Sequence, residues 1–221
     1  LTPWTYYRYY IRVYDKAGNQ RNDGYHVIRT VDTTNPTIDI TSHIDNSNLG
    51  MITHNKLTFT GTASDNVLVK RVVGNCDGAW ETDDFDVDTS SPTSWTYTHT
   101  FPEGYSKMKF RSQDDAGNWS PYRYVEFTVD TIAPAITFEP TSRSWDSADI
   151  AVKVTASDAT TGIKTTRYSW SATTTPGSWA TFTSGSTLTQ KNDGTWYLHI
   201  EATDNAGNVF TTYKGPYRKD S

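Results

Sequence analysis

Cys76 is the only cysteine among the 221 residues. A single thiol can form neither an intramolecular disulfide nor a cysteine-based metal cluster. Because no paired histidine motif accompanies it, we expect Cys76 to be a turn residue in the segment Asn-Cys-Asp-Gly and not a nucleophile. Domains of secreted eukaryotic proteins often carry disulfides, so the shortage of cysteine favours the cytoplasm or the exterior of a bacterial cell.

Long apolar runs are absent as well. No run reaches the roughly 18 apolar residues that cross a bilayer as a helix, so we expect no direct membrane insertion. The mean hydropathy of -0.66 indicates a very polar surface, while 35% apolar residues suffice for the cores of two small domains. No stretch repeats its apolar residues with the period of an amphipathic helix.

Positive charge and catalytic motifs are also scarce. The formal net charge is -5, whereas a nucleic-acid-binding domain needs a basic face. The five histidines show no metal-ligand spacing, and the sequence has no nucleophile elbow, phosphate loop or dinucleotide fingerprint. Paired carboxylates can indicate glycoside hydrolysis, but here they recur with a repeat, whereas a catalytic centre is normally built once. We therefore expect no enzyme and no nucleic-acid partner.

What the sequence does contain is an alternation of polar residues with β-branched and aromatic ones, as in residues 56–62 and 149–155. This pattern predicts half-buried β-strands. A pentapeptide, Asp-x-Ala-Gly-Asn, follows such runs three times, at residues 15–19, 114–118 and 204–208. Because glycine takes the positive φ of a tight turn without steric cost, each copy predicts a β-hairpin.

The spacing of the repeats predicts domains. The hairpins are 99 (114 − 15) and 90 (204 − 114) residues apart, which is the size of an immunoglobulin-like sandwich. A further aspartate follows each copy, at Asp32, Asp130 and Asp220. We predict an all-β fold of tandem immunoglobulin-like (Greek-key) β-sandwich domains. The predicted parts are residues 1–32, the last two strands of a truncated domain, and two complete domains, 33–130 and 131–221.

The first of these parts cannot be stable by itself, because two strands and a turn bury no core in water. We expect Trp4, Tyr6, Tyr10 and Val13 to pack either against residues of a longer protein or against the next domain. The sequence is therefore interpreted as a fragment of a longer protein.

Aspartate outnumbers glutamate by 20 to 5. Its short side chain bonds backbone amides in turns and fits compact Ca²⁺-binding loops. In an immunoglobulin-like sandwich the incoming linker and two of the loops, one between the second and third strands and one between the last two, lie at one end. The aspartates at these places are Asp32, Asp65, Asp114 and Asp115 in the first complete domain, and Asp130, Asp158 and Asp204 in the second.

Two interpretations of these aspartates stay open. Carboxylates gathered in one pocket are unfavourable unless a cation neutralises them, and a divalent ion with about six to eight oxygen ligands, Ca²⁺, suits such a pocket. In the alternative, the aspartates only cap turns, and Pro36 and Pro134 stiffen the linkers. For Asp15 no preceding domain completes the site, so the sequence does not predict whether an ion binds there.

The repeats carry a resemblance. Asp-x-Ala-Gly-Asn is followed by Val-Asp-Thr-x-x-Pro at residues 31–36 and 129–134, and Thr-Ala-Ser-Asp stands midway at 62–65 and 155–158. This pattern, with the run at residues 194–204, resembles the bacterial immunoglobulin-like repeats of surface adhesins and other cell-envelope proteins. The resemblance covers nearly the whole chain. It implies tandem β-sandwiches that hold a functional tip away from the cell, in several cases stiffened by Ca²⁺.

The aromatic residues motivate a rival function. The sequence has eight Trp and fourteen Tyr, and sugar-binding modules stack pyranose rings on exposed aromatic side chains. The candidate sugar sites are residues 80–84 and 119–122, although a sandwich core also needs aromatics, as at 95–97 and 168–170. The acidic stretch at 83–88 is outside the repeat pattern, which makes it a binding loop specific to this domain or a solvated insertion.

The sequence thus favours a non-enzymatic structural or spacer segment of a large bacterial cell-surface or secreted protein, located outside the cell. It would serve adhesion or surface assembly, with calcium-stiffened domain junctions. The expected partners are neighbouring immunoglobulin-like repeats of the same parent chain, and then a host, cell-surface or self-assembly partner. The alternative is a carbohydrate-binding accessory module of a secreted enzyme, with a glycan as its ligand.

Overall fold

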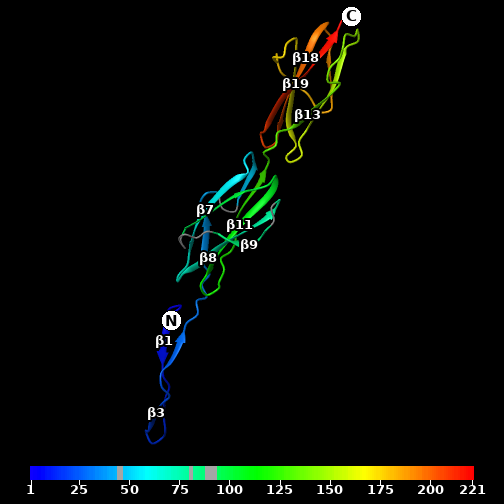
Figure 1. Cartoon of the computed structure of the whole chain (residues 1–221). Coiled ribbons are helices and arrows are strands. Elements are labelled where there is room, and N and C mark those ends of the chain that lie inside the picture. Colours follow the sequence, from blue (N-terminus) through cyan, green and yellow to red (C-terminus); the bar gives the residue numbers. More distant parts are fainter. Residues whose placement is uncertain (44–46, 80–81, 88–93) are drawn as a thin grey trace. The chain divides into compact units, whose positions relative to one another are not determined.

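The computed structural model describes residues 1–43, 47–79, 82–87 and 94–221. In these residues every regular element is a β-strand, as Figure 1 shows. No helix in this part of the chain is long and apolar enough to cross a membrane. The predicted all-β class is therefore confirmed.

Residues 6–29 form a two-stranded ribbon in two sections. Strand β1 (Tyr6–Tyr9) pairs with β4 (His26–Arg29), and β2 (Arg12–Tyr14) pairs with β3 (Gln20–Asn22). The two sections are separated at residues 10 and 11, where the backbone N–H of Ile11 donates to a carboxylate oxygen of Asp23 at 2.8 Å instead of to a strand carbonyl.

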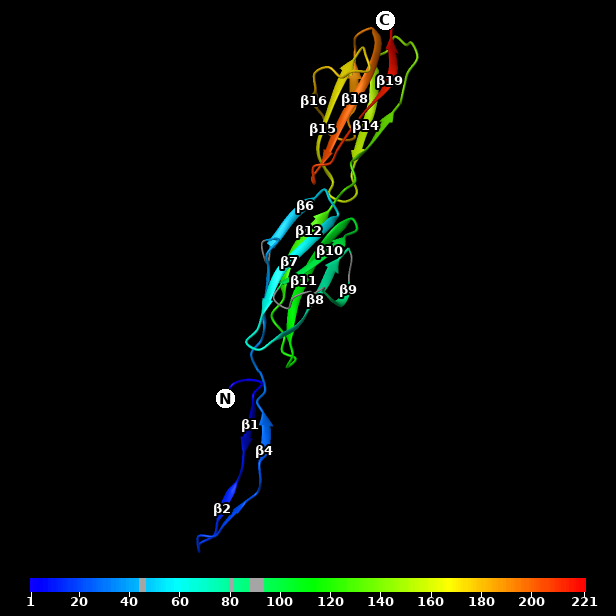
Figure 2. The same cartoon turned by 60° about the vertical axis from the view of Figure 1, so that its left-hand side comes forward.

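The next two sheets are built from residues 37–129. One has the order β10-β7-β5 and the other β6-β12-β11-β8-β9. In Figure 2, β8, β11 and β12 lie side by side as this order requires. The strands are β5 (Thr37–Ile40), β6 (Ser47–Ile52), β7 (Lys56–Ser64), β8 (Val69–Gly78), β9 (Thr82–Asp86), β10 (Ser94–Thr100), β11 (Gly104–Asp114) and β12 (Arg123–Val129).

Alternation along the strands decides which side chains enter the core. On β7, Leu57, Phe59, Gly61 and Ala63 are buried, and the residues between them are exposed or half-buried. The ring of Phe110 on β11 lies 5.4 Å from that of Phe59 and 4.5 Å from that of Trp95. The strand predicted at residues 56–62 and the core role predicted for Trp95 are both confirmed.

Cys76 corrects an expectation. It is a fully buried residue of β8 and not a turn residue. The strand continues through it because Cys76 pairs with Thr82 of β9, and its backbone N–H donates to the Thr82 hydroxyl at 3.1 Å. Strand β8 ends at Gly78, which has a φ of 115°.

Two more sheets are formed by residues 135–219. A three-stranded sheet has the order β13-β14-β17, and a four-stranded sheet has the order β16-β15-β18-β19. The strand predicted at 149–155 is confirmed as β14. The strands are β13 (Ala135–Glu139), β14 (Ile150–Ser157), β15 (Ile163–Ser171), β16 (Ala180–Thr181), β17 (Thr187–Gln190), β18 (Gly194–Asp204) and β19 (Val209–Lys219).

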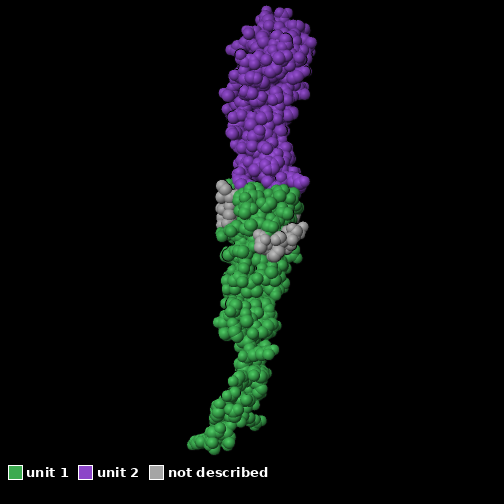
Figure 3. All heavy atoms as spheres, turned by 90° about the vertical axis from the view of Figure 1, so that its left-hand side faces the viewer, with its two compact units in different colours: residues 1–48, 58–99, 107–126 green, residues 49–57, 100–106, 127–221 purple. Residues whose placement is uncertain are grey.

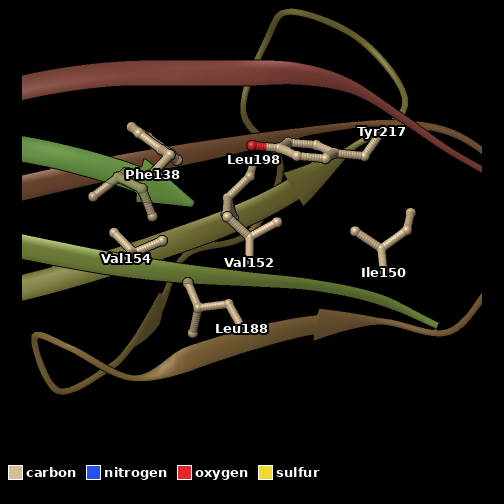
Figure 4. Packing of buried hydrophobic residues seen from close by; sticks show 8 residues of the cluster. Phe138, Ile150, Val152, Val154, Leu188, Leu198 and Tyr217 are labelled. Atoms are coloured by element: carbon tan, nitrogen blue, oxygen red, sulfur yellow. The ribbon is translucent and has the colours of Figure 1, made fainter. Parts of the chain in front are cut away.

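The core between these sheets is apolar on both sides. Val152 and Val154 of β14 and Leu198 of β18 are fully buried, and Figure 4 shows them in the space between the ribbons. Tyr217 of β19 is also buried, with its hydroxyl donating to the carbonyl of Pro140 at 2.8 Å. Burial raises the pKa of the Tyr217 hydroxyl well above its usual value, so it stays a neutral donor.

The chain divides into two compact units, coloured in Figure 3. The first comprises Leu1–Asn48, Thr58–His99 and Lys107–Glu126, and the second Leu49–Leu57, Thr100–Ser106 and Phe127–Ser221. The domain boundaries predicted from the repeats stay predictions.

Gly61 of β7 gives a test of the first core. A Cβ atom at this residue would lie 2.1 Å from the carbonyl oxygen of Asp39 and 2.2 Å from the indole of Trp95. Because overpacking a core typically costs about 1–3 kcal/mol, Gly61→Ala should lower the free energy of unfolding by about 2 kcal/mol in urea titrations. Thr62→Ala, at an exposed position of the same strand, is the matched control. Coincident unfolding curves for the two variants would contradict this packing.

Candidate metal centre

Two linker aspartates begin the candidate sites. Asp32 follows β4 and Asp130 follows β12, and both side chains are at most 1% exposed. Each carboxylate accepts a hydrogen bond from the backbone two residues later, from Thr34 at 3.0 Å and from Ile132 at 3.3 Å. In both linkers, the backbone after the aspartate therefore turns so that its N–H bonds the carboxylate.

The pentapeptide loops supply a second aspartate to each site. Asp114 ends β11 and Asp204 ends β18, and both are buried. The backbone N–H of Asn118 donates to Asp114 Oδ1 at 2.7 Å, and that of Asn208 donates to Asp204 Oδ1 at 2.8 Å. The turns close through Gly117 and Gly207, whose φ values of 96° and 105° favour glycine. The predicted hairpins are confirmed.

The third aspartate lies in the loop after β7 in the first sandwich and after β14 in the second. Asp65 Oδ2 accepts hydrogen bonds from the N–H groups of Val67 and Leu68, at 2.8 and 3.2 Å. Asp158 Oδ1 accepts three, from residues 160, 161 and 162. Both side chains are half-buried.

The structure brings these residues together. Oxygen atoms of Asp32, Asp65 and Asp114 all lie within 4.8 Å of one another. Oxygen atoms of Asp130, Asp158 and Asp204 also lie within 4.8 Å of one another. We call these groups the first and second triads. Each lies inside one compact unit. Within the described ranges, no Lys or Arg forms an ion pair with any of the six carboxylates.

The chemistry of each triad suits a hard cation. Three carboxylates at this separation repel one another in a partly buried site, and a nearby positive charge removes that repulsion. Their oxygens are the ligands that Ca²⁺ prefers, with carbonyls and water completing the shell. The donor set therefore fits the predicted calcium, and metal ligation by these residues stays a prediction.

Asn66 adds a fourth side chain to the first triad. One polar atom of its amide faces both oxygens of Asp65, at 3.1 and 3.2 Å, and Asp32 Oδ2 at 3.3 Å. With nitrogen in that place, Asn66 donates to both carboxylates, and with oxygen there it offers a fourth ligand to a cation. The orientation of this amide thus depends on what neutralises the triad.

The second triad has a hydroxyl in a comparable place. Thr161 donates from its hydroxyl to Asp130 Oδ2. The backbone carbonyl of Thr161 in turn accepts a 2.6 Å hydrogen bond from Asn205. Each triad therefore consists of three aspartates. The neutral residue beside them differs, being Asn66 in the first triad and Thr161 in the second.

The sequence analysis missed the role of the asparagine that ends the pentapeptide. Asn118 Nδ2 donates to Asp114 Oδ2 at 2.7 Å and to the backbone carbonyl of Asp32 at 3.0 Å. Asn208 makes the same two bonds to Asp204 and Asp130, at 2.8 and 2.9 Å. One amide thus ties the hairpin to the linker in each unit. The signal was available, because asparagine ends all three copies.

Two other aspartates of the repeat lie apart. Asp115 is exposed and is not in the group formed by Asp32, Asp65 and Asp114. Asp15 is exposed too, although its loop makes the local bonds, with Asn19 Nδ2 donating to its Oδ2 at 2.8 Å. Hydrogen bonds from the side chain and backbone of Asn19 hold the pKa of Asp15 below its usual value.

The candidate sugar sites are partly described. Residues 80 and 81 lie outside the described ranges. The guanidinium of Arg111 lies over the rings of Trp119 and Tyr122, 4.1 and 4.7 Å from their centroids, so a cation covers a face of each ring. Trp119 and Tyr122 are thus in cation–π contact with a charged side chain of the protein itself.

The acidic stretch at 83–88 belongs to edge strand β9 up to Asp86, so the interpretation of this part as a binding loop is wrong. Asp84 forms an ion pair with Arg111, and Asp86 with Arg71 at 3.4 Å. The carboxylates thus neutralise cations on β11 and β8 of the same sheet. Residue 88 lies outside the described ranges.

Comparison with known proteins identifies the fold. No protein-family model and no curated protein matches this chain. Among solved structures, an I-band fragment of titin matches all of the chain and 77% of its own length, with a TM-score of 0.53 and 11% identity. The fold is an immunoglobulin-like β-sandwich.

Bacterial proteins are among the other structural matches. Fibronectin(III)-like modules of Clostridium thermocellum CbhA match 42% of this chain and 97% of their own, with 23% identity and a TM-score of 0.34. The D00-D0 domain of intimin matches 81% of this chain and 98% of its own, with 13% identity and a TM-score of 0.39.

The asparagine bridge gives a test with a control inside the same chain. Asn208→Ala removes the donor to a fully buried carboxylate, which typically costs about 1–3 kcal/mol of unfolding free energy. Asn19→Ala removes the same local bond from the exposed Asp15, so the unfolding curve should not move. Thermal and urea unfolding of both variants measure the difference. Equal stability of the two variants would show that the bridge in the second unit contributes nothing.

Proposed function

We propose that this chain is a non-enzymatic structural segment of a bacterial cell-surface or secreted protein, serving adhesion or surface assembly outside the cell. The observation that carries the proposal is the second occurrence of the same three-aspartate arrangement, built from corresponding residues of two units. A catalytic centre is built once, whereas a geometry that recurs with a repeat serves the architecture of each repeat.

The partners that follow from this role are neighbouring immunoglobulin-like repeats of the same parent chain. Repeats of this kind are stabilised by their own cores and by their neighbours. The sequence motifs shared with bacterial adhesin repeats, together with the polar surface, support a location outside the cell. A host, cell-surface or self-assembly partner would then bind to the complete array.

Calcium bound by the two triads is the second part of the proposal. In the first unit the ion would be held by Asp32, Asp65 and Asp114, with Asn66 Oδ1 as a further ligand. In the second it would be held by Asp130, Asp158 and Asp204. Because Asp32 and Asp130 belong to linkers, bound Ca²⁺ would fix each linker against two loops and restrict its backbone.

The expected result is a calcium-dependent stability. An ion that binds the folded state stabilises it by about 2.7 kcal/mol at a free concentration 100 times its dissociation constant. Differential scanning calorimetry should therefore give a higher melting temperature in Ca²⁺ than in EDTA, and isothermal titration calorimetry should give two sites. Small-angle scattering should report greater flexibility in EDTA. Identical melting and scattering curves in both buffers would refute calcium binding.

Single substitutions assign the sites. Asp65→Asn should remove the first site and leave the second, and Asp158→Asn should do the reverse, because each removes one carboxylate of its triad. Asp39→Asn, at an exposed aspartate 3.8 Å from Arg123, is the matched control and should keep both sites. If Asp65→Asn and Asp39→Asn bind calcium alike, the triad serves only to cap turns.

A further inference from the structure

We propose that one face of the N-terminal ribbon, β1 to β4, is a docking surface that closes an immunoglobulin-like sandwich. Its occupant would be the open sheet pair of a neighbouring repeat of the same parent chain. The inference rests on the proposed function, since that function supplies the neighbouring repeats.

The three copies of the pentapeptide show which face this is. Tyr9, Ile11 and Val13 stand six, four and two residues before the first aspartate of their copy. The residues at these positions in the other copies are Met108, Phe110, Ser112, Leu198, Ile200 and Ala202. All six are 0% exposed, whereas Tyr9, Ile11 and Val13 are 43%, 53% and 61% exposed. The same positions are thus core residues in two copies and surface residues in the first.

The second unit shows what covers this face. Leu198 and Ile200 of β18 pack in one core cluster with side chains of the opposite sheet, among them Val152, Val154 and Leu188. The edge of β18 is covered as well, because β15 pairs with it through eight residues, from Ile163 to Ser171. In the ribbon, β2 has β3 as its one strand partner in the described part of the chain. Both a face and an edge are therefore open.

The chemistry of the occupant follows from this comparison. It must present an apolar sheet face of β-branched and aliphatic side chains to Tyr9, Ile11 and Val13. It must also supply an antiparallel strand for the free edge of residues 9–14. An exposed apolar row on a two-stranded ribbon is unstable in water, so covering it by such a sheet is favourable.

The other face of the ribbon is built for solvent. Arg12 lies over the ring of Tyr10 at 5.2 Å and donates to Asn22. Arg111 stands at the same position of its copy and lies over Trp119 and Tyr122 on the half-exposed side of β11. Tyr10 therefore lies on the face of Arg12, and Val13 shares the other face with Tyr9 and Ile11. The packing expected of Tyr10 and Val13 against another part of the protein stays a prediction.

The turn of the ribbon, residues 15–19, contains the asparagine whose counterparts bind a linker in the two sandwiches. In the two sandwiches, Nδ2 of Asn118 and of Asn208 donates both to the aspartate of its loop and to a linker carbonyl. Asn19 makes the first of these bonds at 2.8 Å, and in the described residues its amide donates to no linker carbonyl. A neighbouring repeat would bring its own incoming linker to this turn.

A graft of the chain's own strands tests the proposal. Residues 131–189 placed directly before Leu1 reproduce the spacing of the second sandwich, because residue 190 stands 14 positions before Asp204, as residue 1 does before Asp15. Hydrogen exchange of the amides of residues 9–14 is measured in EDTA, so that the result does not depend on calcium. In the graft their exchange should slow at least about 100-fold relative to the unmodified chain.

Two matched variants of the graft test whether the slowed exchange depends on the face formed by Tyr9, Ile11 and Val13. Ile11→Asp in the graft should abolish the protection, whereas Arg12→Asp, on the opposite face, should retain it. A second graft, residues 33–99 before Leu1, supplies a different core at the same spacing and guards against one graft failing to fold. Rapid exchange of residues 9–14 in both grafts would overturn the proposal.

The last measurement uses the unmodified chain and tests whether a second copy of it covers this face. Sedimentation velocity should find no self-association that depends on the face. A concentration-dependent dimer that Ile11→Asp dissociates and Arg12→Asp does not would show that the occupant is a second copy of this chain. That result would also overturn the proposal. Neither result bears on calcium binding by the triads, which is tested separately.

Discussion

The rest of each sandwich depends on one contact, the asparagine amide that joins a buried carboxylate to the carbonyl of the incoming linker. Asn118 and Asn208 make this contact in the two units. A buried carboxylate without donors would be strongly destabilising, so the donors of the asparagine are needed where the linker covers the hairpin. The contact fixes the end of the hairpin, and the hairpin supplies two core strands.

The negative charge gathered at these contacts explains the bias toward aspartate. A glutamate has one more methylene, and its carboxylate would reach past the amides two to four residues later that hold Asp114, Asp158 and Asp204. The same compactness brings three carboxylates within 4.8 Å. The turn-capping and calcium interpretations are compatible, because a carboxylate has about four acceptor sites and Asp114 uses two of them for the hydrogen bonds from Asn118.

Much of the fold could be predicted from the sequence. The alternation on β7 and β14 and the three Asp-x-Ala-Gly-Asn turns identify strands and hairpins, since both signals are local. The triads were also predicted, because the topology of a sandwich places the linker and two loops at one end. Cys76 was misassigned because a local turn signal, Asn-Cys-Asp-Gly, was overridden by pairing with Thr82 on the next strand.

What the sequence determined by itself is the repeat, and with it the strands, the turns and the aspartates that converge. Only the tertiary structure decided whether the apolar side of a strand is covered. Ile11, Phe110 and Ile200 occupy one position of the repeat, yet Phe110 and Ile200 are buried and Ile11 is 53% exposed. Burial depends on the opposite sheet, which comes from distant residues, so no pattern within a single strand can specify it. The asparagine bridge was hidden for the same reason, because its acceptor lies 78 to 86 residues away.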